Sequence, residues 1–163
     1  MSLKNYYDQL DAIDWQKVNA AHVAQWLKDL ASDDNRMRGN AYNNLDRHVI
    51  DPGSQSWEQY GPLSEVLKTK IPFLVVPFLI QLLEVDHITG KNYILELLTD
   101  LANKIFLDID TLPDANDRAE AGNLYHAVRE GIPVYRNLYQ TPLEPFMKET
   151  AAQLLELCGE DTE

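Results

Sequence analysis

The chain has 163 residues, of which 45% are hydrophobic and 25% are charged, and its formal net charge is −12. This length predicts one domain, residues 1–163, with a core large enough to fold without disulfides. Nucleic acids and anionic membranes are bound chiefly through clustered Lys and Arg. The acidic balance therefore argues against both and weakly favours a basic partner.

The sequence also bears on the cellular compartment. Cys158 is the single cysteine, so no internal disulfide can form, which suits a reducing cytosol. Residues 1–8 contain no apolar signal core, and no apolar segment reaches the roughly 20 residues of a membrane span. We therefore expect a cytoplasmic protein that does not bind membranes.

Apolar residues in the first part of the chain recur at helical spacing. In an N-terminal extension, residues 1–14, three apolar residues lie on one face of a short predicted helix. Residues 22–31 give a clearer pattern, with apolar side chains at i, i+3, i+4 and i+7. Residues 32–35 are typical helix-capping residues and predict the start of a third helix. The helix-breaking residues 51–54 predict its end.

The centre of the sequence is its most apolar part. Residues 71–83 contain one polar side chain, Gln81. A helix that is apolar all round belongs in the middle of a protein. Pro77 either starts the main helix or kinks it, so we expect a buried helix from about residue 76 to 83 with a lead-in turn.

The second half continues the helical pattern up to a polar tail at 159–163, which is expected to fray. No stretch alternates apolar and polar residues as a strand does, so the predicted fold class is all-α. The predicted elements are a regular helix over 94–105, an acidic linker at 108–117, a helix over 121–128, a helical or turn-like piece at 132–139, and a last helix over 141–158.

A weak internal repeat runs through these helices. In three places a basic residue is followed by apolar residues three and seven positions later, which indicates three stacked helix pairs that cover one another's apolar faces. The three sets are Arg38, Ala41 and Leu45; Lys91, Ile94 and Leu98; and Lys148, Ala151 and Leu155.

Several of these segments resemble small bacterial HEAT-repeat-like proteins. The segment 23–45 resembles a HEAT-type repeat, and Val-Pro-Phe-Leu at 76–79 and Ile-Leu-Glu-Leu-Leu at 94–98 are similar to two helices of that family. The resemblance covers roughly residues 15–158. It implies a short right-handed α-α superhelix of about three irregular helix pairs, related to armadillo and HEAT solenoids. It also implies a protein-binding role and carries no catalytic residues over.

The sequence contains no motif that predicts catalysis or a cofactor. A faint calcium-loop pattern at 108–119 lacks the acid and the glycine that such a loop needs, at Leu112 and Pro113. The four histidines are scattered, and Cys158 lies on an apolar helix face, where a buried structural thiol is expected. We expect no metal, no cofactor and no enzymatic activity.

Two groups of residues are candidates for binding a partner. Trp57 and Tyr60 lie in a loop rich in helix breakers, where aromatics are either binding hot spots or side chains tucked under the loop. Four acids form the second group and are either an electrostatic landing site for a basic partner or a solvated face. They are Asp108, Asp110, Asp114 and Asp117.

Two classes of function stay open at this stage. The first is a non-catalytic protein-binding module for a basic partner, for example an immunity or antitoxin-like protein. The second is a helical enzyme or cofactor-handling protein, such as a bilin- or nucleotide-binding one, with a pocket on the concave face of the superhelix.

Overall fold

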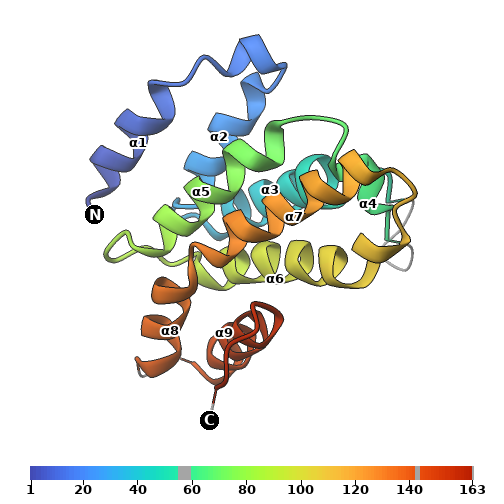
Figure 1. Cartoon of the computed structure of the whole chain (residues 1–163). Coiled ribbons are helices and arrows are strands. Elements are labelled where there is room, and N and C mark those ends of the chain that lie inside the picture. Colours follow the sequence, from blue (N-terminus) through green and yellow to red (C-terminus); the bar gives the residue numbers. More distant parts are fainter. Residues whose placement is uncertain (55–59, 142–143, 163) are drawn as a thin grey trace.

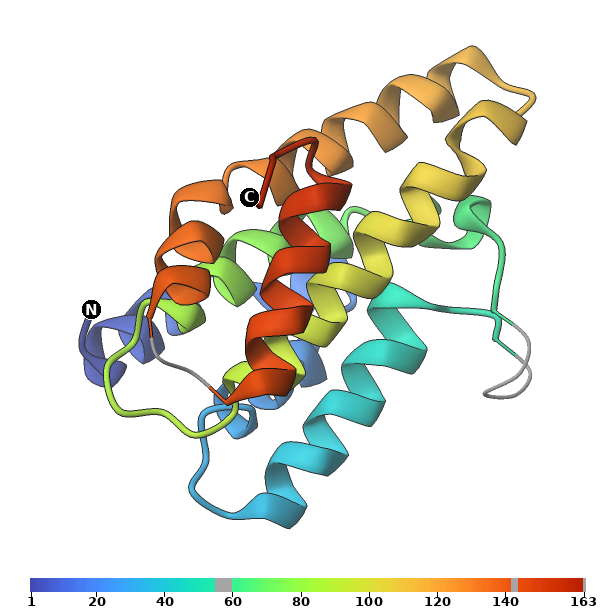
Figure 2. The same ribbon diagram turned by 90° about the horizontal axis from the view of Figure 1, so that it is seen from below.

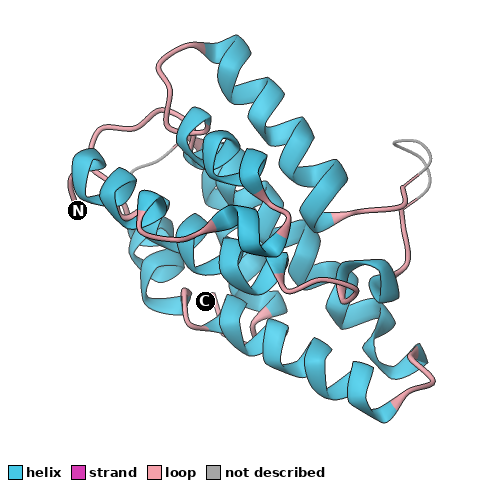
Figure 3. Ribbon diagram, turned by 90° about the horizontal axis from the view of Figure 1, so that it is seen from above, coloured by secondary structure: helices cyan, strands magenta, loops and turns pink. Residues whose placement is uncertain are grey.

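The computed structural model describes residues 1–54, 60–141 and 144–162. Within these ranges the chain forms helices, turns and loops and no strand, which confirms the all-α prediction (Figures 1 and 3). The α-helices are α1 (Leu3–Asp11), α2 (Ala21–Asp29), α3 (Asn35–Leu45), α4 (Leu63–Val66), α5 (Ile71–Leu83), α6 (Lys91–Asp108), α7 (Ala115–Arg129), α8 (Ile132–Gln140) and α9 (Pro145–Leu157).

The helices pack in consecutive pairs. Helix α2 contacts α3, α5 contacts α6, and α8 contacts α9. The second members of these pairs, α3, α6 and α9, lie side by side with α6 in the middle, and Figure 2 shows that they run in the same general direction. The three predicted sets of basic and apolar residues fall on these three helices, so the sequence repeat corresponds to a repeated position in space.

Helices α5 and α6 form the centre of the core. Leu79 of α5 and Leu98 of α6 are completely buried. The predicted start of α5 near residue 76 is wrong by more than a turn, because the helix already begins at Ile71 with Pro72 in its first turn. Pro77 lies inside the helix on an exposed position, so the backbone hydrogen bond that it cannot make is lost on the solvent side.

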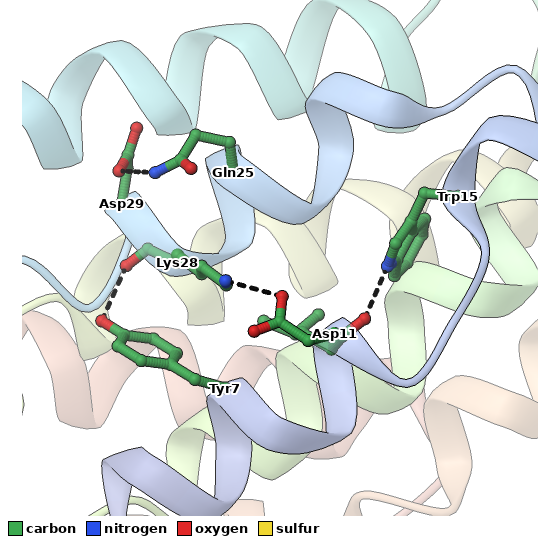
Figure 4. Close-up of polar contacts among 7 residues, drawn as sticks. Tyr7, Asp11, Trp15, Gln25, Lys28 and Asp29 are labelled. Atoms are coloured by element: carbon green, nitrogen blue, oxygen red, sulfur yellow. Dashed lines mark hydrogen bonds and ion pairs between the residues drawn. The ribbon is translucent and has the colours of Figure 1, made fainter.

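The N-terminal helix α1 is anchored to α2 by polar contacts that Figure 4 shows in detail. The indole N–H of Trp15 donates to the carbonyl of Leu10 at 2.9 Å, and the ammonium of Lys28 contacts Asp11 at 2.7 Å. The hydroxyl of Tyr7 donates to the carbonyl of Lys28 at 3.4 Å. The predicted extension is therefore packed against the rest of the core.

Local sequence explains where several helices begin. Asp34 accepts hydrogen bonds from the backbone N–H groups of Arg36 and Met37 at 2.8 and 3.0 Å and so caps α3. Asp114 caps α7 in the same way. Helix α9 begins at Pro145, later than the predicted start at residue 141, and a proline is favoured in the first turn because its N–H would be unpaired there.

The C-terminal residues, predicted to fray, contact α8. Arg136 forms an ion pair with Glu160, and the hydroxyl of Tyr139 donates to the carbonyl of Thr162 at 3.0 Å. The end of the chain is thus held beside the last helix pair.

Candidate functional site

One stripe of α6 lines two neighbouring hollows in the surface. The first has a volume of about 420 Å³ and the second about 290 Å³, and both are lined by Asp100 and Asn103, so they adjoin along α6. We call this feature the α6 groove. Its floor consists of α6 residues spaced three or four apart: Glu96, Thr99, Asp100, Asn103, Lys104, Leu107 and Asp108.

The two walls of the groove come from the neighbouring helices. On one side lie Tyr42 of α3 and the residues that continue this helix, Asp46 to Asp51. On the other side lies α9, which contributes Phe146, Thr150 and Gln153. The second hollow therefore lies where α3, α6 and α9 meet, and the first is lined by α6, the end of α3 and residues 60–62. Figure 2 shows the side-by-side arrangement of the three helices.

A π-helical turn shapes the first wall. Residues Asp46–Ile50 continue α3 in this wider form, and the backbone N–H of Asp51 bonds the carbonyl of Asp46 five residues earlier at 2.6 Å. The turn brings Asp46, Ile50 and Asp51 against α6. Single π turns inside helices occur frequently at functional sites.

Asp51 and Lys104 form a buried ion pair at the base of the groove. Both residues are less than a tenth exposed. The carboxylate of Asp51 accepts a hydrogen bond from the Lys104 ammonium and a second one from the backbone N–H of Gly61 at 2.8 Å. The charge of Lys104 is therefore largely neutralised within the chain.

Among the described residues that line the groove, Lys104 is the single cation, so the other carboxyl groups have no ion pair of their own there. Burial raises the pKa of Asp100 to about 6, helped by the negative charges of Asp46, Glu96 and Asp51 and opposed by Lys104. Burial and the charge of Asp51 likewise raise the pKa of Asp46. These carboxylates are held in a partly desolvated place, where their negative charge is disfavoured.

The phenol of Tyr42 extends this cluster to the second hollow. Burial raises its pKa, and the charges of Glu96, Asp100 and Asp46 and a hydrogen bond with Glu96 raise it further. Tyr42 therefore stays protonated at neutral pH, and its hydroxyl donates to the carboxylate of Glu96 in the groove wall.

Large apolar side chains are exposed at both ends of the groove. Tyr60 and Leu107 line the first hollow and are 78% and 62% exposed. Phe146 lines the second hollow and is 53% exposed. Exposed aromatic and aliphatic side chains beside a polar hollow are typical of surfaces that bind another molecule.

Some of the residues predicted to bind a partner line the α6 groove, and others lie elsewhere. It places Tyr60 and Asp108 in the α6 groove. It places Asp110 in an exposed 3₁₀ turn, Asp114 at the cap of α7 and Asp117 in the first turn of α7, none of which lines the groove. Trp57 lies outside the described residues.

Sequence reasoning missed the main acidic residues of the groove, Asp46 and Asp100. One signal for the second was present, because Glu96, Asp100 and Lys104 form a polar stripe at i, i+4 and i+8 on the most regular apolar helix of the sequence. The proximity of Asp46 depends on the π turn and on the packing of α3 against α6, which no local pattern indicates.

Possible metal ligands, Cys158 and membrane-spanning segments were the other features considered in the sequence. Within residues 1–54, 60–141 and 144–162, no three His, Cys, Asp or Glu side chains form a group that could hold a metal ion. Burial raises the pKa of the Cys158 thiol to about 11, so it stays protonated and unreactive at neutral pH. In the same part of the chain, none of the helices combines the length and apolarity that crossing a membrane requires.

Comparisons with protein-family models, curated proteins and solved structures give no match to this chain.

Proposed function

We propose that this chain is a non-catalytic protein-binding module whose α6 groove receives a basic segment of a partner protein. The observation that carries the proposal is the composition of the groove. It combines partly buried carboxylates with exposed apolar side chains, and among the described residues that line it the single cation, Lys104, is already paired with Asp51.

The helix arrangement supports such a role. Three consecutive helix pairs, with α3, α6 and α9 side by side, are consistent with a short α-α superhelix like those of HEAT and armadillo proteins. Superhelices of this kind bind partners on the extended surface formed by equivalent helices of successive repeats. In such a superhelix α3, α6 and α9 would be the equivalent helices, and residues of α3, α6 and α9 line the α6 groove.

The charge of the groove suits recognition of a basic partner. Complementary charges raise association rates and suppress wrong partners. Exposed charges are screened beyond about 8 Å at physiological ionic strength, whereas partly buried ones are screened less. The groove carboxylates therefore keep more of their field at the docking site than acids spread over the surface.

A small-molecule site is the second candidate. The first hollow, of about 420 Å³, lies within the range of roughly 300–1,000 Å³ typical of ligand pockets. Asp100, with a pKa of about 6, is also poised to exchange a proton near neutral pH. This candidate predicts binding that saturates with a low-molecular-weight compound and needs no protein partner.

The experiment is an affinity capture from cells that produce the protein, with matched charge reversals. The groove variant is Asp46→Lys with Asp100→Lys, and the control is Asp110→Lys with Asp117→Lys, which changes the net charge equally outside the groove. We expect the wild type and the control to capture the same basic protein, and the groove variant to associate with it several-fold more slowly at low salt. Equal capture by all three proteins would refute the proposal.

If instead the retained material is a small compound released on denaturation, the second candidate is supported. Mass spectrometry of the bound fraction distinguishes the two results. Circular dichroism of each variant shows that the helical fold is retained.

A further inference from the structure

The first hollow of the α6 groove contains more negative charge than the chain neutralises. Asp46 from the π turn and Asp100 from α6 both line it, and the negative charge of Asp46 adds to the effect of burial in raising the pKa of Asp100. Lys104 lowers the pKa of both carboxyl groups but donates its hydrogen bond to Asp51. A second cation placed between Asp46 and Asp100 would relieve this repulsion.

Resting on the function proposed above, we infer that the partner segment inserts a Lys or Arg side chain between Asp46 and Asp100, and that the complex dissociates in mildly acidic solution. Both side chains offer the same chemistry, a cationic head on an aliphatic stem, and the experiment below separates them. Lys104 shows within this chain that a lysine ammonium fits beside a carboxylate at the base of the same hollow.

The rest of the hollow suits the stem of such a side chain. Leu107 and Tyr60, which are 62% and 78% exposed, line the hollow and provide apolar and aromatic surface. Lys and Arg bury their methylene groups along apolar surface while the charged head reaches polar groups, and an aromatic ring attracts a nearby cation. The occupant that matches both the charge and the shape is therefore a basic side chain.

The length of the groove indicates a peptide segment. Its floor spans α6 from Glu96 to Asp108. At about 1.5 Å per residue this distance is about 18 Å. It corresponds to a partner helix of about three turns or to five or six extended residues. One cation in the first hollow and an apolar side chain near Phe146 in the second would occupy both parts.

The charged and titratable groups around Asp100 determine the pH dependence. Glu96 and Lys104 belong to α6 itself, Asp46 and Asp51 come from the π turn and its end, and Tyr42 comes from α3. The side chains that α9 contributes to the groove are uncharged: Phe146, Thr150 and Gln153. Asp100 is the group in this set whose pKa is raised to about 6.

The sign of the effect follows from linkage. A bound cation favours the carboxylate and lowers the pKa of Asp100 below its value of about 6 in the free protein. The complex then holds fewer protons than its separated parts. Affinity is therefore full above pH 6 and falls as the pH drops below it, by up to about tenfold per pH unit for one proton.

The test uses a displayed library of random 12-residue peptides that lack His, selected against the whole protein at pH 7.5. The tightest peptide is synthesised with a fluorescent label, and its dissociation constant is measured by fluorescence anisotropy from pH 5 to 8. Without His, no internal peptide side chain except an acid titrates near pH 5, and peptides with acids are discarded.

We expect the selected peptide to contain an essential Lys or Arg. Replacing it by norleucine or citrulline, which keep the shape of Lys and Arg without the charge, should weaken binding at least tenfold at pH 7.5. Exchanging Lys for Arg tests whether the geometry prefers one head group. Affinity for the wild type should fall roughly fivefold between pH 6 and 5, where Asp100 of the free protein goes from half to mostly protonated.

Asp100→Asn should bind the same peptide more weakly at pH 7.5 and lose this pH dependence, while Asp110→Asn behaves as the wild type. Because the histidines of the protein are present in all variants, a pH effect that survives in Asp100→Asn would overturn the inference.

The outcomes separate this inference from the proposed function. If Asp46→Lys with Asp100→Lys abolishes binding but the uncharged peptide binds as well as the cationic one, the groove binds peptides and the inference is wrong. If the selection yields no peptide, or peptides that ignore this groove variant, both the inference and the proposed function fail.

Discussion

Two acidic regions of this protein look alike in composition and differ in physical state. The connection between α6 and α7 and the first turn of α7 contain Asp110, Asp114 and Asp117 close together in sequence. The α6 groove contains Asp46 and Asp100, which are far apart in sequence and meet only in the folded chain. The connection acids are solvated or cap a helix, whereas burial raises the pKa of both groove acids.

The difference shows that the number of acids in a segment does not indicate where a bound cation would be stabilised most. An exposed carboxylate is stabilised by water and screened by salt. A partly buried carboxylate without a close cation is disfavoured in the free protein and gains more from a cationic ligand. Four substitutions test this contrast.

The largest expected effect concerns the one groove acid that has its own cation, Asp51. Lys104→Met leaves the carboxylate of Asp51 buried with a single backbone hydrogen bond from Gly61. We expect a loss of about 3–5 kcal/mol in the free energy of unfolding, because an unpaired buried charge remains. Urea denaturation at pH 7.5 measures it.

The double variant Lys104→Met with Asp51→Asn is the matched control. It removes both charges and keeps an acceptor for Gly61, so it should recover part of the stability. A single variant that loses less than about 1 kcal/mol would show that the pair is solvated.

In the connection, Asp114 has the largest expected effect. Its side chain accepts from the backbone N–H of Asn116 at 2.7 Å, so Asp114→Ala removes a helix cap and should cost about 1 kcal/mol. Asp114→Asn keeps the acceptor and should stay close to the wild type. Thermal unfolding followed by circular dichroism compares the two, and equal losses would assign the effect to charge instead of capping.

Replacing Asp100 should stabilise the protein, whereas replacing Asp114 should destabilise it. The variant Asp100→Asn is expected to stabilise the protein by about 0.5–1 kcal/mol at pH 7.5, a reduced value because the side chain is partly exposed to solvent. The pKa of about 6 in the folded protein lies above the unfolded value of about 3.9, so the wild type loses stability as the pH rises between these values.

The gain of Asp100→Asn should therefore be absent at pH 4, grow up to about pH 6 and stay constant above it. Urea denaturation at pH 4, 6 and 7.5 provides the measurement. A gain that is the same at every pH would exclude ionisation of Asp100 as its cause.

The smallest expected effect belongs to Asp110, which is exposed and caps nothing. Asp110→Asn should change the free energy of unfolding by less than about 0.5 kcal/mol in either direction. A larger change, measured in the same urea experiment, would mean that the two acidic regions differ less than the structure indicates.

The sequence predicts the framework of the fold better than its site. Helical spacing indicates α2, α3, α6 and α9, because each buries one regular apolar face. The recurrent basic residues at Arg38, Lys91 and Lys148 indicate the three helices that lie side by side. The sequence does not indicate the early start of α5, because Pro77 is typical of a helix start or a kink, whereas here it lies inside a continuous helix at an exposed position.

The site depends on features that no local pattern contains. Tyr60 and Asp108 are predicted as partner-binding residues and line the groove, but the sequence gives no reason to connect them. Asp46 and Asp100 come close because α3 packs on α6 and because a π turn follows α3. The amino-acid composition of this turn does not indicate that it is π-helical. The proposed HEAT-like superhelix and the basic partner stay predictions.

The π turn also lets the chain hold one more residue without turning the helix. Each hydrogen-bonded loop of a π turn holds one residue more than a loop of an α-helix. Deleting one residue between Asp46 and Ile50 would shorten the loop that the N–H of Asp51 closes on the carbonyl of Asp46 to the length of an α-helical loop. Asp51 would then keep its direction toward Lys104. The groove should therefore tolerate the loss of one residue here, and an insertion at this place is a route by which an extra side chain enters a helix while the residues that follow keep their orientation.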